Sequence, residues 1–215
     1  MPKIDRHGKA AILNAQQITK LFEAFGSDRD RALFGCCLYL GCRISEACSL
    51  QTIDVYSPGG EVRSQIQIRR AATKGKQETR TLDTHPQLLQ LLEAHRPGKT
   101  WVFQSRSHHW KHIDADSADW ILREACRKAG LEGVSTHSFR RTALTAMSNA
   151  GVPLRVIQEV SGHHSLNELQ KYLEVSEEQR RSAIATLNFH HFGIDTFSDI
   201  AAGSIATASV FMGDS

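Results

Sequence analysis

Two stretches in the first forty residues have the hydrophobic period of an α-helix. In the first, apolar side chains recur every three or four residues, at Ile18, Leu21, Phe22 and Phe25. Asn14 and Gln17 precede them with the spacing of an N-terminal capping box, and Gly26 follows. The second stretch, from Arg31 to Leu40, is apolar nearly all round, which predicts a helix buried in the core. Gly41 ends this helix.

The pattern changes between Gln51 and Asp83. Residues 62–68 partly alternate between apolar and polar side chains, and a second short run follows at residues 77–82. The turn-forming sequences Ser57-Pro58-Gly59-Gly60 and Thr73-Lys74-Gly75-Lys76 bound the first run. These features predict a small antiparallel sheet with a hairpin whose tip carries two lysines.

Helical patterns return after this sheet. The predicted segments are His85 to His95, Ala118 to Ala129, His137 to Ala150, Pro153 to Val160, and two that begin at Ser165 and Ser176 with capping-box patterns. The predicted fold class is therefore mainly α with a small antiparallel β-sheet (α+β). Residues 1–188 are expected to form one domain. Residues 189–215 are expected to be a C-terminal tail, either disordered or docked on a neighbouring molecule.

Composition and charge add limits to this outline. The 215 residues include 40% hydrophobic and 23% charged side chains, as in ordinary globular proteins. The longest apolar run is too short to span a bilayer and the N-terminus lacks a signal-peptide core, so a cytoplasmic protein is expected. Residues 189–215 hold three acidic side chains and no Lys or Arg. The rest of the chain therefore carries +6, three above the net +3 of the whole, which permits a polyanionic partner.

The cysteines predict no disulfide framework. Their number is odd, four of them lie in one apolar stretch, and none forms a pair of CxxC motifs. The five are Cys36, Cys37, Cys42, Cys48 and Cys126. We expect all of them to be buried and reduced.

Six polar residues form an ordered series across about 130 positions. They are Arg43 in Gly-Cys-Arg-Ile-Ser-Glu, Lys74 in Thr-Lys-Gly-Lys, His137 and Arg140 in His-Ser-Phe-Arg, His163 after Gly162, and Tyr172, nine residues beyond His163. In this order and spacing the chain closely resembles the catalytic domains of the tyrosine recombinases (phage integrase family). Each short motif alone is weak, and the joint match is specific.

The resemblance implies a transesterification at a DNA phosphodiester. Arg43 and Arg140 would hold the non-bridging phosphate oxygens, on which negative charge builds up in the transition state. His137 would hydrogen-bond the same phosphate or help take the proton of the tyrosine, and His163 would add another donor. Site-specific recombination by this route is the expected activity.

The nucleophile and the general acid are also assigned through the resemblance. Tyr172 would attack the phosphorus and form a 3′-phosphotyrosine, which conserves the bond energy for religation. Lys74 would protonate the leaving 5′-oxygen, and Lys76, two residues on in the same turn, is the rival for this role. Because cationic side chains supply the charge, neither a metal nor another cofactor is expected.

Five further basic residues are candidates for binding DNA phosphates: Arg69, Arg70, Lys76, Arg80 and Arg141. A solvated hairpin face would carry the same charges, so that interpretation remains open. The expected partners are double-stranded DNA and further copies of the chain, as a tetramer on DNA, without a membrane. Relatives often carry an N-terminal core-binding domain, and none is expected here.

Two other functions remain open from the residues. A type IB topoisomerase shares much of this chemistry and relaxes supercoils without strand exchange. A helix-turn-helix-like regulator without catalysis would use Pro153 to Leu173, and Ser161 stands where the family usually has Leu, which leaves room for a degenerate recombinase. The histidine-rich segments 108–112 and 190–191 lack companion ligands at a recognised metal-binding spacing.

Overall fold

The computed structural model describes residues 10–69, 78–108, 110–170 and 177–187. Within these residues the chain forms ten helices and one two-stranded sheet, which confirms the predicted mainly α class. The helices are α1 (Ala15–Ala24), α2 (Asp28–Tyr39), α3 (Ile44–Cys48), α4 (Thr52–Val55), α5 (Pro86–Ala94), α6 (Ala115–Ala129), α7 (Thr136–Asn149), α8 (Leu154–Ser161), α9 (Leu166–Gln170) and α10 (Glu177–Ala185). The chain divides into two compact units, 1–174 and 175–215, and α10 belongs to the second.

The sheet is the predicted antiparallel pair. β1 (Gln65–Ile68) and β2 (Arg80–Asp83) pair with Gln65 opposite Asp83 and Ile68 opposite Arg80. Ile66 and Ile68 point into the core and are fully buried, while Gln65 and Gln67, which alternate with them, are exposed. The region predicted as sheet also contains the short helix α4, which the alternating pattern did not indicate.

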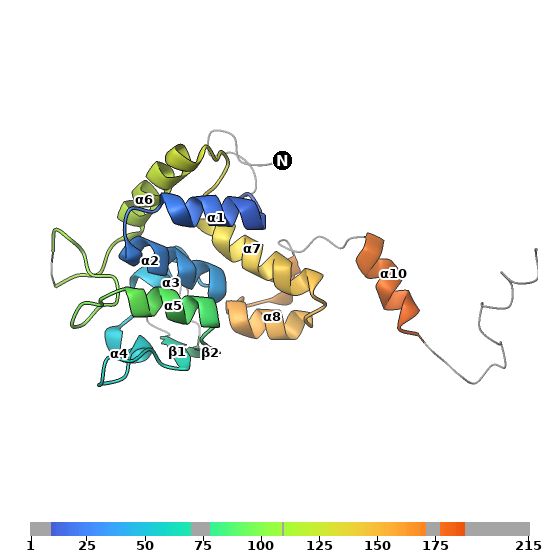
Figure 1. Ribbon diagram of the computed structural model, residues 1–215. Helices are drawn as coiled ribbons and strands as arrows, with labels where there is room; N and C mark the ends of the chain where they lie inside the picture. The colour runs from blue at the N-terminus through green and yellow to red at the C-terminus, as the bar shows by residue number, and fades with distance from the viewer. Residues whose placement is uncertain (1–9, 70–77, 109, 171–176, 188–215) are drawn as a thin grey trace, which may run out of the picture. The chain divides into compact units, whose positions relative to one another are not determined.

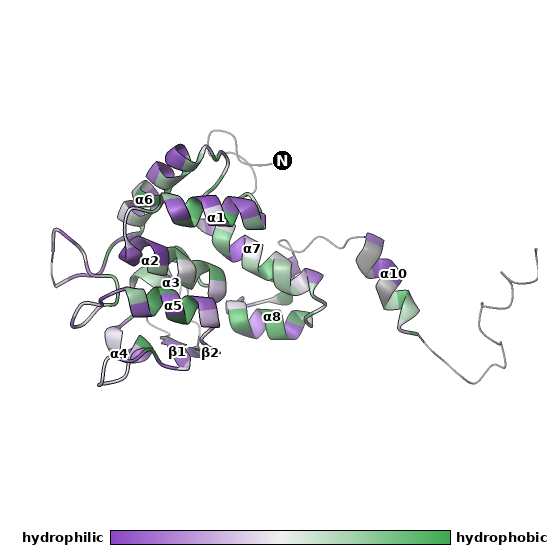
Figure 2. Ribbon diagram, in the orientation of Figure 1, coloured by the Kyte–Doolittle hydropathy of each residue, from purple (hydrophilic) through white to green (hydrophobic). Residues whose placement is uncertain are grey.

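The main core is built around α2. This helix packs between α5 and α7 (Figure 1), and its apolar residues are buried on all sides, as its composition predicted. The Phe34 ring stacks on Phe25 with centroids 4.7 Å apart and lies 5.1 Å from Phe139 of α7. α6 has alternating polar and apolar segments (Figure 2), as expected of a helix with one face in the core and one face exposed to solvent.

A smaller apolar cluster fixes the position of the segment after α7. Leu144 of α7, Ile157 of α8 and Leu169 of α9 are buried against one another. Gly162 ends α8 with a φ of +63°, in the left-handed region that glycine adopts without strain. The chain therefore reverses at Gly162, and His163 follows on the side of α7.

Local capping interactions set several helix ends. The predicted capping box of α1 is confirmed, because the Gln17 amide N–H donates to Asn14 Oδ1 at 2.9 Å and Asn14 N–H donates to Gln17 Oε1 at 3.0 Å. α6 begins three residues before the predicted Ala118 because Asp114 accepts a hydrogen bond from the Ser117 amide at 2.7 Å.

The five cysteines are free and buried, as predicted. Across the described ranges, no helix combines the length and the apolar character that crossing a bilayer requires.

Candidate active site

Arg43 lies at the junction between α2 and α3. Gly41 has a φ of +56° and turns the chain out of α2, so that Arg43 takes an extended conformation and becomes the N-cap of α3. Its backbone N–H donates to Glu46 Oε2 at 2.9 Å, and its side chain donates from NH1 to Glu46 Oε1 at 3.0 Å. Glu46 thus fixes both the backbone and the guanidinium of Arg43.

Glu46 is fully buried and is shared between two arginines. In addition to Arg43, the NH2 group of Arg80 on β2 donates to Glu46 Oε2 at 3.1 Å. Burial alone would raise the pKa of Glu46, but the charge of Arg80, the Arg43 amide and the charge of Arg140 outweigh it and lower that pKa. The carboxylate is therefore ionised and ties α3 to β2.

Arg140 extends from α7 between two backbone segments that are distant in sequence. Its NH1 group donates to the Gly41 carbonyl at 2.6 Å, and its NH2 group donates to the Ser161 carbonyl at 2.8 Å. Burial, together with the charge of Arg43, lowers its pKa to about 10, so Arg140 remains charged at neutral pH. These bonds hold the guanidinium in one orientation next to the start of α3.

His163 lies against Arg140. The NH2 nitrogen of Arg140 is 3.3 Å from His163 Nδ1 and 3.2 Å from Nε2, and the Ser161 hydroxyl oxygen is 2.7 Å from Nδ1. Burial, followed by the charges of Arg140 and Arg43, lowers the pKa of His163 to about 3. At neutral pH the imidazole is therefore uncharged and keeps one N–H to donate.

We call Arg43, Arg80, Arg140 and Glu46 the arginine cluster. Three guanidiniums surround one buried carboxylate, so the cluster carries two positive charges without a balancing carboxylate of its own. Holding like charges together in a poorly solvated place is costly unless an anion joins them. The arrangement suits an anion with one or two negative charges.

A groove of about 1120 Å³ adjoins this cluster between β2 and α8. Arg80, Gly162 and His163 contribute to its wall, and Tyr39 and His164 line it farther along. The groove is open to solvent, so the buried charges of the cluster lie next to a surface that a large ligand can reach.

The remaining predicted residues are placed as follows. His137 is exposed in the first turn of α7, three residues before Arg140, with which it shares a helix face. Lys74, Lys76, Arg70 and Tyr172 lie outside the described residues. The structure therefore brings together Arg43, Arg140 and His163 from the sequence prediction.

The predicted phosphate contacts differ in their surroundings. The Arg69 side chain is 44% exposed and donates to both oxygens of Asp54, at 2.6 and 2.8 Å, and this pairing raises its pKa. Arg141 is buried, and its NH1 group donates to the Ala10 carbonyl at 2.7 Å. Arg80 does not lie on a solvated hairpin face, which was the alternative interpretation, since it is buried in the arginine cluster. A DNA-binding role for these residues stays a prediction.

Two residues of this site were given no role from the sequence. Glu46 stood inside the Arg43 motif, and its position in an otherwise apolar turn was the signal, because a buried acid needs a cationic partner. Ser161 departs from the family pattern, and its hydroxyl contacts His163. No local pattern indicated Arg80 as the second partner of Glu46.

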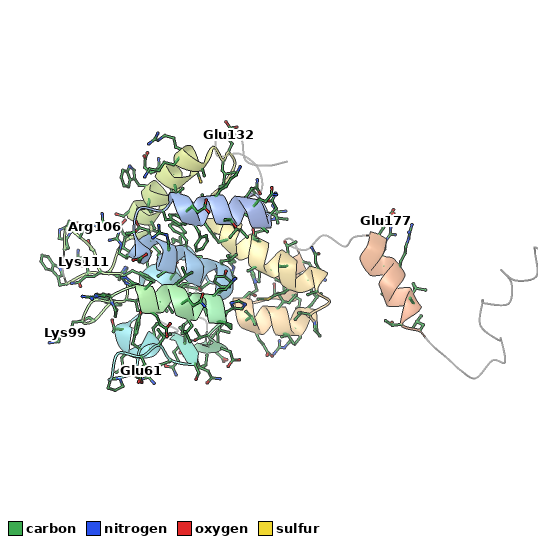
Figure 3. All side chains as sticks on the ribbon, viewed as in Figure 1. Glu61, Lys99, Arg106, Lys111, Glu132 and Glu177 are labelled. Atoms are coloured by element: carbon green, nitrogen blue, oxygen red, sulfur yellow. The ribbon has the colours of Figure 1, made fainter. Side chains whose placement is uncertain are left out.

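The histidine-rich segment lies in the loop between α5 and α6. Figure 3 shows Lys99, Arg106 and Lys111 of this loop pointing away from the body of the first unit. His112 donates from Nδ1 to the carbonyl of Ile113, its neighbour in the chain. In the part of the chain that the structure describes, no group of three or more His, Cys, Asp or Glu side chains is arranged to hold a metal ion.

Comparison with solved structures supports the fold assignment. The crystal structure of XerA recombinase matches 84% of this chain and 66% of its own length, with a TM-score of 0.68 and 22% identity. A Tn1549 transposon integrase in complex with circular intermediate DNA matches 86% of this chain and 69% of its own, with a TM-score of 0.69 and 16% identity. At these identities the likeness is one of fold.

Comparison of sequences identifies the family. The tyrosine recombinase XerA of Pyrococcus furiosus is 29% identical over 182 residues, which are 82% of this chain and 61% of that relative. The tyrosine recombinase XerD of Neisseria meningitidis is 29% identical over 185 residues, 81% of this chain and 62% of the relative. The chain thus spans about three fifths of the length of these relatives. The model of the phage integrase family matches residues 11–179, and the chain belongs to that family.

Proposed function

We propose that this chain is the catalytic domain of a site-specific DNA recombinase that cleaves and rejoins DNA through a 3′-phosphotyrosine at Tyr172. One observation carries the proposal: Arg43 and Arg140 are fixed beside neutral His163 in a buried cluster with two unbalanced positive charges. A phosphodiester carries one negative charge, and the pentacoordinate state reached during attack carries two. The cluster is preorganised for that increase in charge.

Each residue has a definite task in this reaction. Arg43 and Arg140 bind the non-bridging oxygens, and His163 donates an N–H to the same phosphate. Tyr172 attacks the phosphorus while Lys74, with Lys76 as the alternative, protonates the leaving 5′-oxygen. His137, on the first turn of α7, assists at the phosphate or takes the tyrosine proton. The reverse attack by a 5′-hydroxyl restores the phosphodiester and frees Tyr172.

The proposed partner is double-stranded DNA, bound by several copies of the chain. XerH has been solved on its difH substrate, and a λ integrase dimer on a core site, which supports the same class of partner here. We propose a tetramer on paired sites, acting in the cytoplasm. Direct DNA contacts from Arg69, Arg70 and Lys76 belong to this proposal.

Covalent trapping tests the proposal. A DNA site would be selected from random duplexes by binding, then rebuilt as a panel of duplexes nicked at successive positions, so that the cleaved end diffuses away. The wild-type chain should form an adduct that survives SDS, and Tyr172→Phe should bind the same DNA without forming it. Tyr39→Phe is the matched control, because Tyr39 lines the groove beside the cluster and should not be needed.

The other outcomes separate the alternatives. DNA binding without an adduct across the whole panel would contradict the proposal and favour a non-catalytic regulator. Relaxation of supercoiled DNA by a monomer, without strand exchange, would indicate a topoisomerase. An adduct formed by Tyr172→Phe and lost in Tyr39→Phe would assign the nucleophile to Tyr39.

A further inference from the structure

Arg80 is buried beside the candidate active site although it lies at the start of a short strand. Its side chain is 8% exposed, and its NH2 group donates to Glu46 Oε2 at 3.1 Å. The Nε and NH1 atoms are also buried, and neither has a hydrogen-bond partner among the described residues. Buried guanidinium N–H groups are rarely left unpaired, so this side chain is arranged for an acceptor that the described residues do not supply.

The position of Arg80 is fixed by Gly162 as well as by Glu46. A Cβ atom placed on Gly162 would lie 2.0 Å from Arg80 NH1, 2.7 Å from Cζ and 2.9 Å from Cδ. The guanidinium therefore fills the space above the glycine that leads into His163. Because Arg80 and His163 both line the groove between β2 and α8, a ligand that reaches the imidazole is also next to this guanidinium.

The charges of the arginine cluster also indicate that an anion would bind next to Arg80. Glu46 gives one oxygen to the Arg43 guanidinium and the other to Arg80, so a single carboxylate serves both cations. The charge of Arg80 also contributes to lowering the pKa of Arg140 and that of His163. Arg80 therefore interacts electrostatically with both of these side chains. An anion bound by Arg43 and Arg140 would also reduce the electrostatic repulsion that acts on Arg80.

We propose that Arg80 is a third guanidinium of the phosphate site and donates from Nε or NH1 to the DNA phosphate that Arg43 and Arg140 hold. This inference rests on the proposed function for the identity of the anion. It assigns Arg80 to the reacting phosphate, whereas the other basic residues near the hairpin would contact the DNA backbone elsewhere. Glu46 then orients two of the three arginines at once.

Binding to neutralised DNA tests the assignment without requiring cleavage. In the Tyr172→Phe chain, Arg80→Gln should weaken binding to the selected duplex by about 10-fold or more, the scale of a hydrogen bond to a charged group. A series of duplexes would each carry one uncharged methylphosphonate. When the methylphosphonate replaces the phosphate that Arg80 contacts, Arg80→Gln should no longer weaken binding. Arg43→Gln should lose its effect on binding at the same methylphosphonate position.

Two further variants keep the result interpretable. Arg155→Gln removes a charge from the wall of the same groove, and any effect it has should persist at that methylphosphonate. Arg80→Lys keeps the charge and the pair with Glu46 but lacks the second arm of the guanidinium, so it replaces Arg80→Gln if that variant fails to fold.

The proposal is overturned if the loss of affinity is the same on every modified duplex, because Arg80 would then contact no single phosphate. It is also overturned if the suppressing position differs from that of Arg43, which would assign Arg80 to a neighbouring phosphate. Absence of a covalent adduct in the wild-type chain would count against the proposed reaction, while this binding series would still decide whether Arg80 contacts a phosphate.

Discussion

The surroundings of His163 change its protonation in the folded site. In the unfolded chain its pKa is near 6.5, and in the folded site burial and neighbouring arginines lower it to about 3. In the proposed reaction the imidazole therefore acts as a neutral donor. The Ser161 hydroxyl lies 2.7 Å from Nδ1, and Arg140 NH2 lies 3.2 Å from Nε2, so both ring nitrogens contact neighbours within the site.

This shift makes folding stability depend on pH. Between pH 6.5 and 3 the unfolded chain binds a proton at this residue and the folded chain does not, so the contribution is complete above pH 6.5 and is lost as the pH falls. His163→Gln should reduce the slope of the unfolding free energy between pH 7 and 4.5, measured in urea. The slope should not vanish, because burial also lowers the pKa of His95. An unchanged slope would contradict the neutral, buried state of His163.

Sequence reasoning succeeded at this scale through the joint order and spacing of several short motifs. These motifs pointed to Arg43, Arg140 and His163, and the structure brings the three residues together. The pairing of Glu46 with Arg80 joins residues 34 positions apart, and Arg140 reaches a carbonyl 99 positions away. Such contacts depend on how the elements pack, and the spacing of hydrophobic residues along the chain does not predict them.

Among the elements, α8 and its terminal glycine are the most constrained part of the site. Gly162 has a positive φ and also makes room for Arg80, whereas Gly130 at the end of α6 has nearly the same φ, +65°, and open space around it. The two glycines therefore separate the cost of backbone conformation from the cost of crowding.

Alanine substitution at both positions measures this difference. Gly130→Ala should lower the unfolding free energy by about 1–2 kcal/mol, the cost of a left-handed backbone for a residue with a Cβ. Gly162→Ala should cost a further ~1–3 kcal/mol because the new methyl group displaces Arg80. In an Arg80→Gln background the two glycine variants should converge, as judged by urea unfolding. Equal costs in the original background would mean that Arg80 moves aside freely.

Element boundaries were predictable where caps were strong and wrong where capping chemistry was overlooked. The Asn14 and Gln17 pair located the start of α1, but Asp114 extended α6 by a turn that the apolar pattern did not require. α4 has four residues, which is too short for a helical period to appear in the sequence.

For the whole molecule, the distribution of charge determines how the domain would meet DNA. The chain without residues 189–215 carries +6, but the basic residues differ in availability. Arg69 lies at the surface with its charge paired to Asp54, and Arg141 is buried against the N-terminal segment at Ala10. Sequence alone could not separate these two, because both stand among basic neighbours.

The salt dependence of DNA binding distinguishes them. Arg69→Gln should weaken binding to all duplexes alike and reduce the slope of log affinity against log salt by about 1, as expected for one lost phosphate contact. Arg141→Gln should leave that slope unchanged and lower the melting temperature instead, because its guanidinium bonds within the chain. A reduced slope for Arg141→Gln would show that its side chain reaches DNA after all.

The two backbone hydrogen bonds of Arg140 connect segments of the chain that are synthesised at different times. Its guanidinium bridges the carbonyl groups of Gly41 and Ser161, so the site consists of segments that leave the ribosome far apart in time. A nascent chain that has exposed Arg43 but has not yet released residues 140–163 has no such bridge and no assembled arginine cluster. The active site of the proposed recombinase is thereby incomplete until residues 140–163 have been synthesised.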